Sequence, residues 1–353
     1  MTTHYSLISL DDAKLPLFLG IDVGGTNIKF GVVDDLGRPL AKGQIPTFEE
    51  RGPRDGVRRT HAAVFELLAE KGIDPSQLSA VGLATPGTMD IANGMILEPH
   101  NLPHWFNFPI KQEVYNAFQL PTAYANDANA AAYGEFWVGR GRQFHSIVLL
   151  TLGTGVGGGI IIGDLSIDGE NSCGSECGHI IIDCSPTARI CPCGQPGHLE
   201  AYCSATALIK RTTELIAEGR KSSLASLIDE DHHLTGLMIA QAAEAGDALA
   251  NEVIDELARY LGIGIVTLMH TIDPGAVVLG GAMNFGGSDT ALGRKFLETI
   301  RSVVRQHAFP IPAQRTTIDF ALLEGDAGFI GAAGIARLDR LQRLIRPGSQ
   351  PAS

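Results

Sequence analysis

The sequence predicts an α/β protein built from two domains. Three observations favour this fold class: a length of 353 residues, short apolar runs alternating with segments of helical periodicity, and an internal repeat. The repeat pairs GIDVGGTNIKFGVV at residues 20–33 with LLTLGTGVGGGIII at residues 149–162. Each copy has the pattern of a strand, a glycine-rich turn with threonine, and a second strand. Two α/β halves of this design would place their two turns across a cleft.

The first half of the chain alternates between strand and helix signals. Apolar runs predict strands, and apolar residues at helical spacing predict helices. In order, we expect two strands around the first glycine turn, a third strand, a helix and a fourth strand: Leu17–Asp22, Ile28–Asp34, Leu40–Ile45, Gly56–Glu70 and Ala80–Thr85. A long turn-rich segment, Pro86–Trp105, is followed by a helix at Ile110–Phe118, a strand at Thr122–Ala125 and an alanine-rich helix from Asp127 to Trp137. Loops as long as residues 86–105 inside a compact domain are often functional.

The second half begins with the other glycine turn. Strands are expected at Ser146–Leu152 and Ile160–Ile162 on either side of it. Residues 164–200 read as irregular and carry every cysteine but one. We expect mainly helix over residues 201–270, a strand at Ala276–Leu279, a further helix and strand, and a Gly/Ala-rich helix at Gly325–Arg346.

Composition limits the possible partners. The net charge of −12 and a pI of about 5.3 give no overall attraction to nucleic acid or to acidic membranes. No run of 18 apolar residues predicts a membrane-spanning helix, and the N-terminus lacks the basic and apolar regions of a secretory signal. We therefore expect a cytoplasmic protein whose six cysteines are thiols or metal ligands rather than disulfides.

Glycine-rich turns let backbone N–H groups approach phosphate oxygens. The second turn formally matches G-x-G-x-x-G at Gly153, Gly155 and Gly158, but it leads into a strand, whereas a dinucleotide fingerprint opens a helix. A Walker A loop is absent because no Gly-Lys pair occurs in the sequence. The alternative without a ligand is a pair of tight hairpins. If the protein binds a nucleotide, it does so with two hairpin turns.

The pattern Asp22-x-Gly24-Gly25-Thr26, the second Gly/Thr turn and the Gly280-Gly281 pair resemble the sugar kinase/actin/Hsp70 ATPase superfamily. Within it, the chain from about Leu17 to Arg337 is most similar to the ROK family of bacterial sugar kinases, especially its glucokinases. The resemblance implies a two-domain actin-like ATPase (ribonuclease H-like) fold with an interdomain cleft, divided into residues 15–125 plus 330–350 and residues 126–329. It also implies that ATP and Mg²⁺ are held by Asp22, Gly24, Gly25, Thr26, Asn27, Gly153, Thr154, Gly155, Gly280 and Gly281.

Asn126 and Asp127 stand at an expected strand-to-helix junction. Asp127 could simply be an N-cap or first-turn acid, which would stabilise the helix by about 1 kcal/mol. The functional alternative is that Asp127 takes the proton of a sugar hydroxyl as it attacks the γ-phosphate. Both can hold together, since side chains at such junctions line α/β clefts. The family resemblance implies that Asp127 is the base and that Asn126 contacts the sugar.

The segment CPCGQPGHLE, residues 191–200, predicts a metal site. Cys191 and Cys193 are too close in sequence for a comfortable disulfide, and with His198 they supply three ligands of the kind zinc prefers. His179 offers the fourth, which completes a Cys₂His₂ set. Two alternatives stay open. Cys184 or Cys177 could replace His198, or the segment could be a glycine turn with two free thiols and a surface histidine.

The ROK motif has the same plan, Glu-x-Gly-His followed by Cys-x-Cys-Gly-x-x-Gly-Cys-x-Glu. This sequence departs from it at His198, where cysteine is usual, at Ser175, where glycine is commoner, and at Cys177, in the variable position. The resemblance implies that zinc is structural and that it orients Glu176 and Glu200 toward the sugar hydroxyls. His179 would use one nitrogen for zinc and the other for the sugar. Without ligands beside them, the two glutamates would be ordinary surface acids.

The turn-rich segment could complete the sugar pocket. By resemblance, Gly87 and either Asn101 or Asn107 would contact the hexose. Trp105 is better explained as a core residue or pocket wall than as a stacking platform. We interpret the remaining histidines, His232-His233 included, as solvated.

Taken with the resemblance, the sequence predicts an ATP-dependent hexose kinase that converts glucose to glucose 6-phosphate. The alternatives are a kinase for fructose, mannose, allose or an N-acetylhexosamine, a polyphosphate-dependent kinase, and a sugar-sensing ROK repressor. Such repressors carry an N-terminal helix-turn-helix domain, whereas only 16 residues precede the first expected strand here. The family also suggests a homodimer or homotetramer.

Overall fold

The computed structural model describes residues 6–99, 101–227 and 234–345. His232-His233 lie outside the described residues. The chain divides into two compact units. The first comprises Met1–Gln143, Gly159–Ser175 and Leu322–Ser353, and the second comprises Phe144–Gly158 and Glu176–Ala321.

The first unit is organised around a five-stranded sheet of order β3-β2-β1-β4-β7. Its strands are β1 (Leu17–Val23), β2 (Asn27–Val33), β3 (Pro39–Pro46), β4 (Leu78–Thr85) and β7 (Thr122–Asn126). The pairs β1–β2 and β2–β3 are antiparallel, whereas β1–β4 and β4–β7 are parallel. Parallel neighbours end at the same edge of a sheet, so the carboxyl ends of β1, β4 and β7 lie together.

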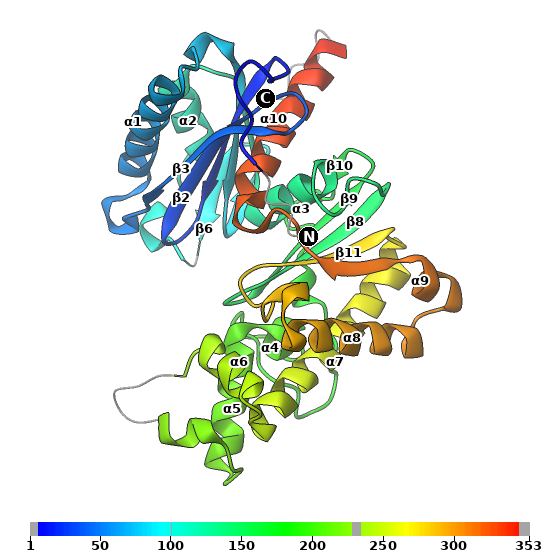
Figure 1. Ribbon diagram of the computed structural model, residues 1–353. Helices are drawn as coiled ribbons and strands as arrows, with labels where there is room; N and C mark the ends of the chain where they lie inside the picture. Colours follow the sequence, from blue (N-terminus) through cyan, green and yellow to red (C-terminus); the bar gives the residue numbers. More distant parts are fainter. Residues whose placement is uncertain (1–5, 100, 228–233, 346–353) are drawn as a thin grey trace. The chain divides into compact units, whose positions relative to one another are not determined.

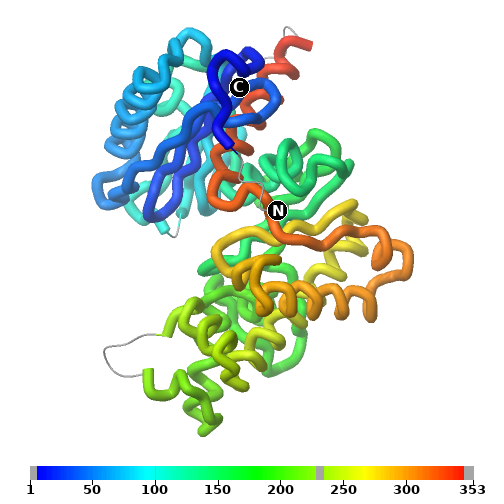
Figure 2. Tube along the Cα trace, viewed as in Figure 1, coloured from blue at the N-terminus to red at the C-terminus, as the bar shows by residue number. Residues whose placement is uncertain are grey.

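Alternating residues of the strands serve two hydrophobic cores. Leu17, Leu19 and Ile21 of β1 pack with buried residues of α1 (Pro53–Lys71) and α2 (Ile110–Phe118). Phe18 faces the other way, toward α10 (Ala327–Ile345). Figure 1 shows α1 and α2 on one face of this sheet and α10 on the other. The C-terminal helix therefore completes a core that the first strands begin, and the trace in Figure 2 shows its red segment beside the blue strands.

Helix α3 (Asp127–Trp137) follows β7 directly and packs along α10. The domain division expected from the sequence, with a boundary at residue 126, stays a prediction. The compact units place α3 with the first unit because it packs against α10 there.

The turn-rich segment after β4 is more regular than the sequence predicts. It contains a small antiparallel hairpin of β5 (Thr88–Asp90) and β6 (Met95–Glu98), and a 3₁₀ turn at Pro103–Trp105. Trp105 is fully buried in the α1/α2 core, which confirms its interpretation as a core residue.

The second sheet has the order β10-β9-β8-β11-β12. It contains β8 (Ser146–Leu152), β9 (Val156–Ile162), β10 (Leu165–Ser166), β11 (Ala276–Gly280) and β12 (Thr317–Phe320). Strand β11 runs parallel to both β8 and β12, so the ends of β8 and β11 are adjacent. The helices of the second unit are α4 (Glu200–Cys203), α5 (Ala205–Ala217), α6 (Gly236–Glu244), α7 (Ala248–Ile272), α8 (Ala291–His307) and α9 (Pro310–Arg315).

These elements confirm the predicted α/β class and the order of the main strands and helices. Strand β9 begins at Val156, earlier than expected, because the glycines of residues 157–159 continue the ladder instead of remaining in the turn. None of the helices among the described residues is long and apolar enough to cross a membrane. The expected cytoplasmic location stays a prediction.

Candidate active site and metal cluster

Asp22 lies near the carboxyl end of β1, directly before the first glycine turn. Its cross-strand neighbour on β2 is Lys29. Desolvation raises the pKa of Asp22 to about 6, and the charge of Lys29 opposes that shift. A bound cation would favour the ionised carboxylate further, which makes Asp22 suited to a site that holds a metal and phosphates.

The first turn, Gly24 to Asn27, is a tight hairpin fixed from outside. The N–H of Gly24 donates to Asn27 O at 2.9 Å. Thr47 fastens the turn twice, because its hydroxyl donates to Gly24 O at 2.6 Å and its N–H donates to Thr26 O at 2.8 Å. Gly25 and Thr26 are exposed at the tip, so their backbone groups are accessible to a ligand.

The residues proposed for the sugar pocket on the turn-rich segment lie in different places. Gly87 follows the end of β4 with a φ of +87°, and a side chain there would collide with Pro99, so only glycine fits. Asn101 borders Gly25, where an added Cβ would lie 3.2 Å from Asn101 Cβ. Asn107 is exposed with a φ of +48°, and its N–H donates to Leu97 O at 3.0 Å as part of the β5–β6 region.

Asn126 and Asp127 form the junction between β7 and α3. Asn126 is the N-cap, and its Oδ1 accepts from the N–H of Ala128 at 2.9 Å. Asp127 is the first residue of the helix, where its Oδ1 accepts from the same N–H at 2.8 Å. Both side chains keep partial exposure at the sheet edge where β1 and β4 also end. Asp127 therefore acts as a first-turn acid of α3, and its partial exposure is compatible with a second role as a base.

The second glycine turn joins β8 to β9 in the other unit. The N–H of Gly153 donates to Gly155 O at 3.0 Å, and Thr154 is exposed at the tip. The start of α5 supports this turn, since the N–H of Ala205 donates to Gly153 O at 2.8 Å. Gly280 ends the neighbouring strand β11. Gly281 follows with a φ of +89° and packs against the backbone of Leu152, so the glycine pair borders the turn.

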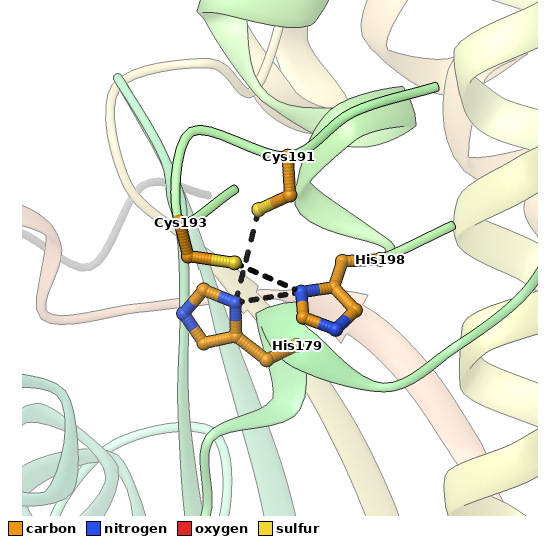
Figure 3. Close-up of side chains that lie close together, drawn as sticks. All are labelled: His179, Cys191, Cys193 and His198. Carbon is orange, nitrogen blue, oxygen red and sulfur yellow. Dashed lines mark hydrogen bonds between the residues drawn. The ribbon is translucent and has the colours of Figure 1, made fainter. Parts of the chain in front are cut away.

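Four predicted metal ligands gather in one cluster. The candidate ligand atoms of His179, Cys191, Cys193 and His198 all lie within 4.8 Å of one another. Figure 3 shows both sulfur atoms and one nitrogen of each ring pointing toward a common centre. Nδ1 of His198 lies 3.2 Å from His179 Nδ1 and 3.2 Å from Cys193 Sγ, and Cys191 Sγ lies 3.8 Å from His179 Nδ1. Ligand atoms bound at about 2.0–2.3 Å to a tetrahedral zinc ion lie roughly 3.3–3.8 Å apart, so the set fits zinc.

The local chain geometry explains why these residues converge. Gly194 and Gly197 adopt φ values of +89° and +79°, which fold the Cys191–His198 loop back on itself. The N–H of Cys191 donates to Gln195 O at 2.9 Å and closes that loop. All six cysteines are free. Cys177 and Cys184, the alternative ligands, are not among the residues of the cluster.

The environment of the cluster acts differently on its histidine and cysteine ligands. Burial lowers the pKa of His198, and the adjacent His179 adds to this effect, so His198 is held as the neutral ring that coordinates metals. Burial raises the pKa of the Cys191 thiol to about 12, so a bound cation is needed to hold it as a thiolate. The other nitrogen of His179, Nε2, faces Glu176 at 4.0 Å.

Glu200 connects the cluster to the second glycine turn. Its Oε1 lies 3.6 Å from Cys191 Sγ, and its Oε2 accepts from the N–H of Val156 at 2.9 Å. Glu176 is exposed at the start of the 3₁₀ turn that carries His179. The two glutamates thus flank the cluster on both sides in the chain.

A pocket of about 300 Å³ lies in the second unit between the cluster loop and α5. Its lining includes Glu200 together with Thr206, Lys210 and Arg211 of α5. The Thr206 hydroxyl donates to Thr154 O at 2.8 Å, so this pocket adjoins the second glycine turn. The lining carries charges of both signs, because Glu200 and Glu214 stand beside Lys210 and Arg211, and Arg211 lies 3.6 Å from Glu256.

Comparison with known proteins identifies the family of the chain. The model of the ROK family matches residues 18–338. The chain is 35% identical to a glucokinase of Halalkalibacterium halodurans, covering 91% of this chain and 94% of the relative. The ROK hexokinase from Thermus thermophilus shares 31% identity with a TM-score of 0.77, covering 92% of this chain and 99% of that one. A ROK glucokinase from Streptomyces griseus, solved in complex with glucose and AMPPNP, shares 33% identity with a TM-score of 0.70, covering 91% and 99%.

The match covers nearly the whole chain at these identities, and the chain belongs to the ROK family. The resemblance drawn from the glycine turns is thereby confirmed, as is the two-domain actin-like fold.

Proposed function

We propose that this protein is an ATP-dependent hexose kinase that phosphorylates the 6-hydroxyl of glucose. The observation that carries the proposal is the edge of the first sheet, where the ends of β1, β4 and β7 bring Asp22, Gly87, Asn126 and Asp127 together. Asp127, a carboxylate that can accept a proton, follows β7 at the same sheet edge as Asp22 of β1, a carboxylate suited to a metal and phosphates; β4 lies between the two strands. The named relatives support ATP and glucose as the substrates.

Asp127 is the residue that we propose as the base. It would take the proton from the 6-hydroxyl while that oxygen forms a bond to the γ-phosphorus, and the bond from that phosphorus to the bridging oxygen of ADP breaks. Phosphoryl transfer needs mainly positioning and charge neutralisation, so one well-placed carboxylate is sufficient. The Oδ1 of Asn126 caps α3, which leaves its amide NH₂ group as the donor to a sugar hydroxyl.

The phosphates would lie against the two glycine turns. We assign Asp22, Gly24, Gly25, Thr26 and Asn27 of the first turn to this role. From the second unit we assign Gly153, Thr154, Gly155, Gly280 and Gly281. When bound, Mg²⁺ would neutralise phosphate charge. Asp22 is the carboxylate of this chain that we assign to it.

The Cys/His cluster would fix the sugar-binding acids. Zinc bound there would clamp residues 179 and 191–198 and so hold Glu176 and Glu200 in place. Their carboxylates can accept paired hydrogen bonds from sugar hydroxyls. His179 would keep Nδ1 toward the metal and Nε2 toward the sugar side, where Glu176 lies. Gly87, Asn101 and Asn107 complete the proposed hexose contacts, and a homodimer or homotetramer stays a prediction.

The test is the identity of the product. Purified protein is incubated with Mg²⁺ and glucose, with ATP or inorganic polyphosphate as donor, and glucose 6-phosphate is measured with glucose-6-phosphate dehydrogenase. Formation with ATP supports the proposal. ATP consumption with mannose, fructose, allose or an N-acetylhexosamine, and none with glucose, would move the assignment to another hexose. Formation of glucose 6-phosphate with polyphosphate but not with ATP would identify polyphosphate as the phosphoryl donor.

A further inference from the structure

Glu135 is a buried carboxylate outside the site described above. It lies on α3 and is 0% exposed. Its Oε1 accepts from the N–H groups of Leu322 and Leu323 at 2.9 and 2.7 Å, and its Oε2 accepts from the N–H of Arg140 at 2.7 Å. A buried carboxylate is costly unless it is paired or hydrogen-bonded, and here three backbone donors satisfy it.

The three donors belong to the segments by which the chain leaves and re-enters the first unit. Arg140 stands shortly before Gln143, where the first segment ends, and Leu322 begins the returning segment. Leu323 is itself buried in the core shared with α10. One side chain on α3 therefore holds the segment before the chain first leaves the first unit together with the segment by which it finally returns.

The returning segment leads directly into α10, which packs against α3 and approaches the carboxylate of Asp22. Gly331 of α10 packs against the carbonyl of Ala130 on α3, so closely that a Cβ there would overlap it. Gly328, in the first turn of α10, lies against the carboxylate of Asp22, where a Cβ would overlap Asp22 Oδ2. The start of α10 is thus a wall behind Asp22, and α3 carries Asp127 at its own start.

We propose that Glu135 is a positioning residue for phosphoryl transfer: it fixes the entry to α10 against α3 and thereby sets Asp22 relative to Asp127. The inference rests on the proposed function for the roles of the two aspartates. Helix α3 reaches Asp127 through its own backbone, so loss of the Glu135 contacts should disturb the Asp22 side more than the sugar side. Nucleotide affinity and turnover should therefore respond, and sugar affinity should not.

A carboxylate is required because both of its oxygens accept. In Glu135→Gln, the amide oxygen can replace one carboxylate oxygen as an acceptor. The amide NH₂ group would face a backbone N–H, so two hydrogen-bond donors would point at each other and neither would be satisfied. The matched control is Asp34→Asn. Asp34 is also a buried carboxylate of the first unit and accepts from the N–H groups of Leu36 and Arg38 at 3.0 and 2.9 Å. It serves the β2–β3 turn and also pairs with the side chain of Arg38 at 2.6 Å. The neighbouring Asp35 contacts Arg337 in the middle of α10, not the start of that helix at Gly328.

The experiment compares wild-type protein, Glu135→Gln and Asp34→Asn for stability, MgADP affinity, glucose affinity and turnover, with affinities measured by calorimetry. We expect Glu135→Gln to bind MgADP about tenfold more weakly and to lose about tenfold in kcat, with glucose affinity within twofold of wild type. Asp34→Asn should lose stability without that pattern. Equal ligand affinities in Glu135→Gln and Asp34→Asn would overturn the inference.

A second variant covers the case in which Glu135→Gln fails to fold. Gly328→Ala places a methyl group directly against Asp22 at the start of α10, the helix that Glu135 is proposed to position, and should reproduce the MgADP defect with glucose affinity retained. Unchanged MgADP affinity in Gly328→Ala would contradict the inference. Wild-type protein that binds MgADP but turns over no hexose would defeat the proposed function instead, while the MgADP comparison would still decide the role of Glu135.

Discussion

The carboxylate of Glu200 accepts a hydrogen bond from the backbone N–H of Val156 at 2.9 Å. This contact joins the residue that follows the Cys/His cluster to the strand that follows the second glycine turn. The other oxygen of Glu200 lies 3.6 Å from Cys191 Sγ. Glu200 thus connects the loop that carries Cys191 to the second glycine turn within the second unit. A change in the loop, in Glu200 or in the turn should therefore affect the other two.

Substitution of Gly155 tests this connection. A Cβ at residue 155 would overlap Glu200 Oε2, so Gly155→Ala should displace the carboxylate and raise the KM for the hexose by about tenfold or more. Steady-state kinetics with varied sugar measure the effect. Gly236→Ala is the control, because an added Cβ there meets nothing closer than Ala205 Cβ at 3.9 Å. A KM in Gly155→Ala equal to that of the control would argue against a sugar contact by Glu200.

Metal content tests the cluster directly. We expect one zinc ion per chain by elemental analysis, lost in Cys193→Ser and retained in Cys184→Ser, whose thiol is exposed and outside the cluster. Removal of the metal with a chelator should lower the melting temperature and weaken sugar binding, since the loop that carries Glu200 loses its clamp. His198→Cys, which restores the residue usual in the family, should keep the ion. Purified wild-type protein without any bound metal would refute the zinc assignment.

Asp127→Asn separates chemistry from binding. The side chain keeps its size, and Asn126 still caps α3, so the fold should be preserved. Loss of the base should reduce kcat by about 10²–10⁴-fold, whereas glucose affinity measured by calorimetry should remain within a few-fold. A variant with wild-type turnover would show that Asp127 is only a first-turn acid.

Asp247 gives a prediction about stability and pH. Desolvation alone would raise its pKa, but hydrogen bonds from Ala250, Ser223 and Ser222 outweigh this and lower the pKa from 3.8 to about 2. A carboxyl group whose pKa is lower in the folded state stabilises it above the unfolded value and loses that effect as the pH falls through the folded value. Asp247→Asn should therefore destabilise the protein by about 1–2 kcal/mol at pH 7. Denaturant unfolding between pH 3 and 7 should show this difference constant above about pH 5 and shrinking below pH 4. A difference independent of pH would contradict the assignment.

Much of the fold follows from local sequence patterns. Strand β1 contributes to two cores, so it reads as an apolar run in the sequence, and Asp22 stands out near the end of that run. The cluster is visible for a related reason: Cys191, Cys193 and His198 are close in sequence, and paired glycines bend the loop that carries them. His198 is one of three departures from the family motif, and the structure places it in the cluster with the other three candidate ligands.

Other features depend on contacts between distant segments. The β5–β6 hairpin is short, and turn residues obscure its alternation, so the sequence showed only a turn-rich loop. Glu135 looks like one polar residue at the end of an alanine-rich helix. Its partners Leu322 and Leu323 lie almost two hundred residues further along the chain. The only local signal is a carboxylate among apolar residues of a buried helix, and this does not identify what it binds.

The most direct test of the central claim is ADP release by the purified, metal-retaining protein with Mg²⁺ and ATP across a panel of hexoses, including N-acetylated ones. We predict release that depends on the sugar, is strongest with glucose and is absent without sugar. Preference for another hexose would leave the proposed roles of Asp127 and the cluster unchanged. It would mean that the sugar contacts assigned to the turn-rich segment are wrong. No ADP release with any sugar, from protein that retains its metal, would contradict the kinase assignment.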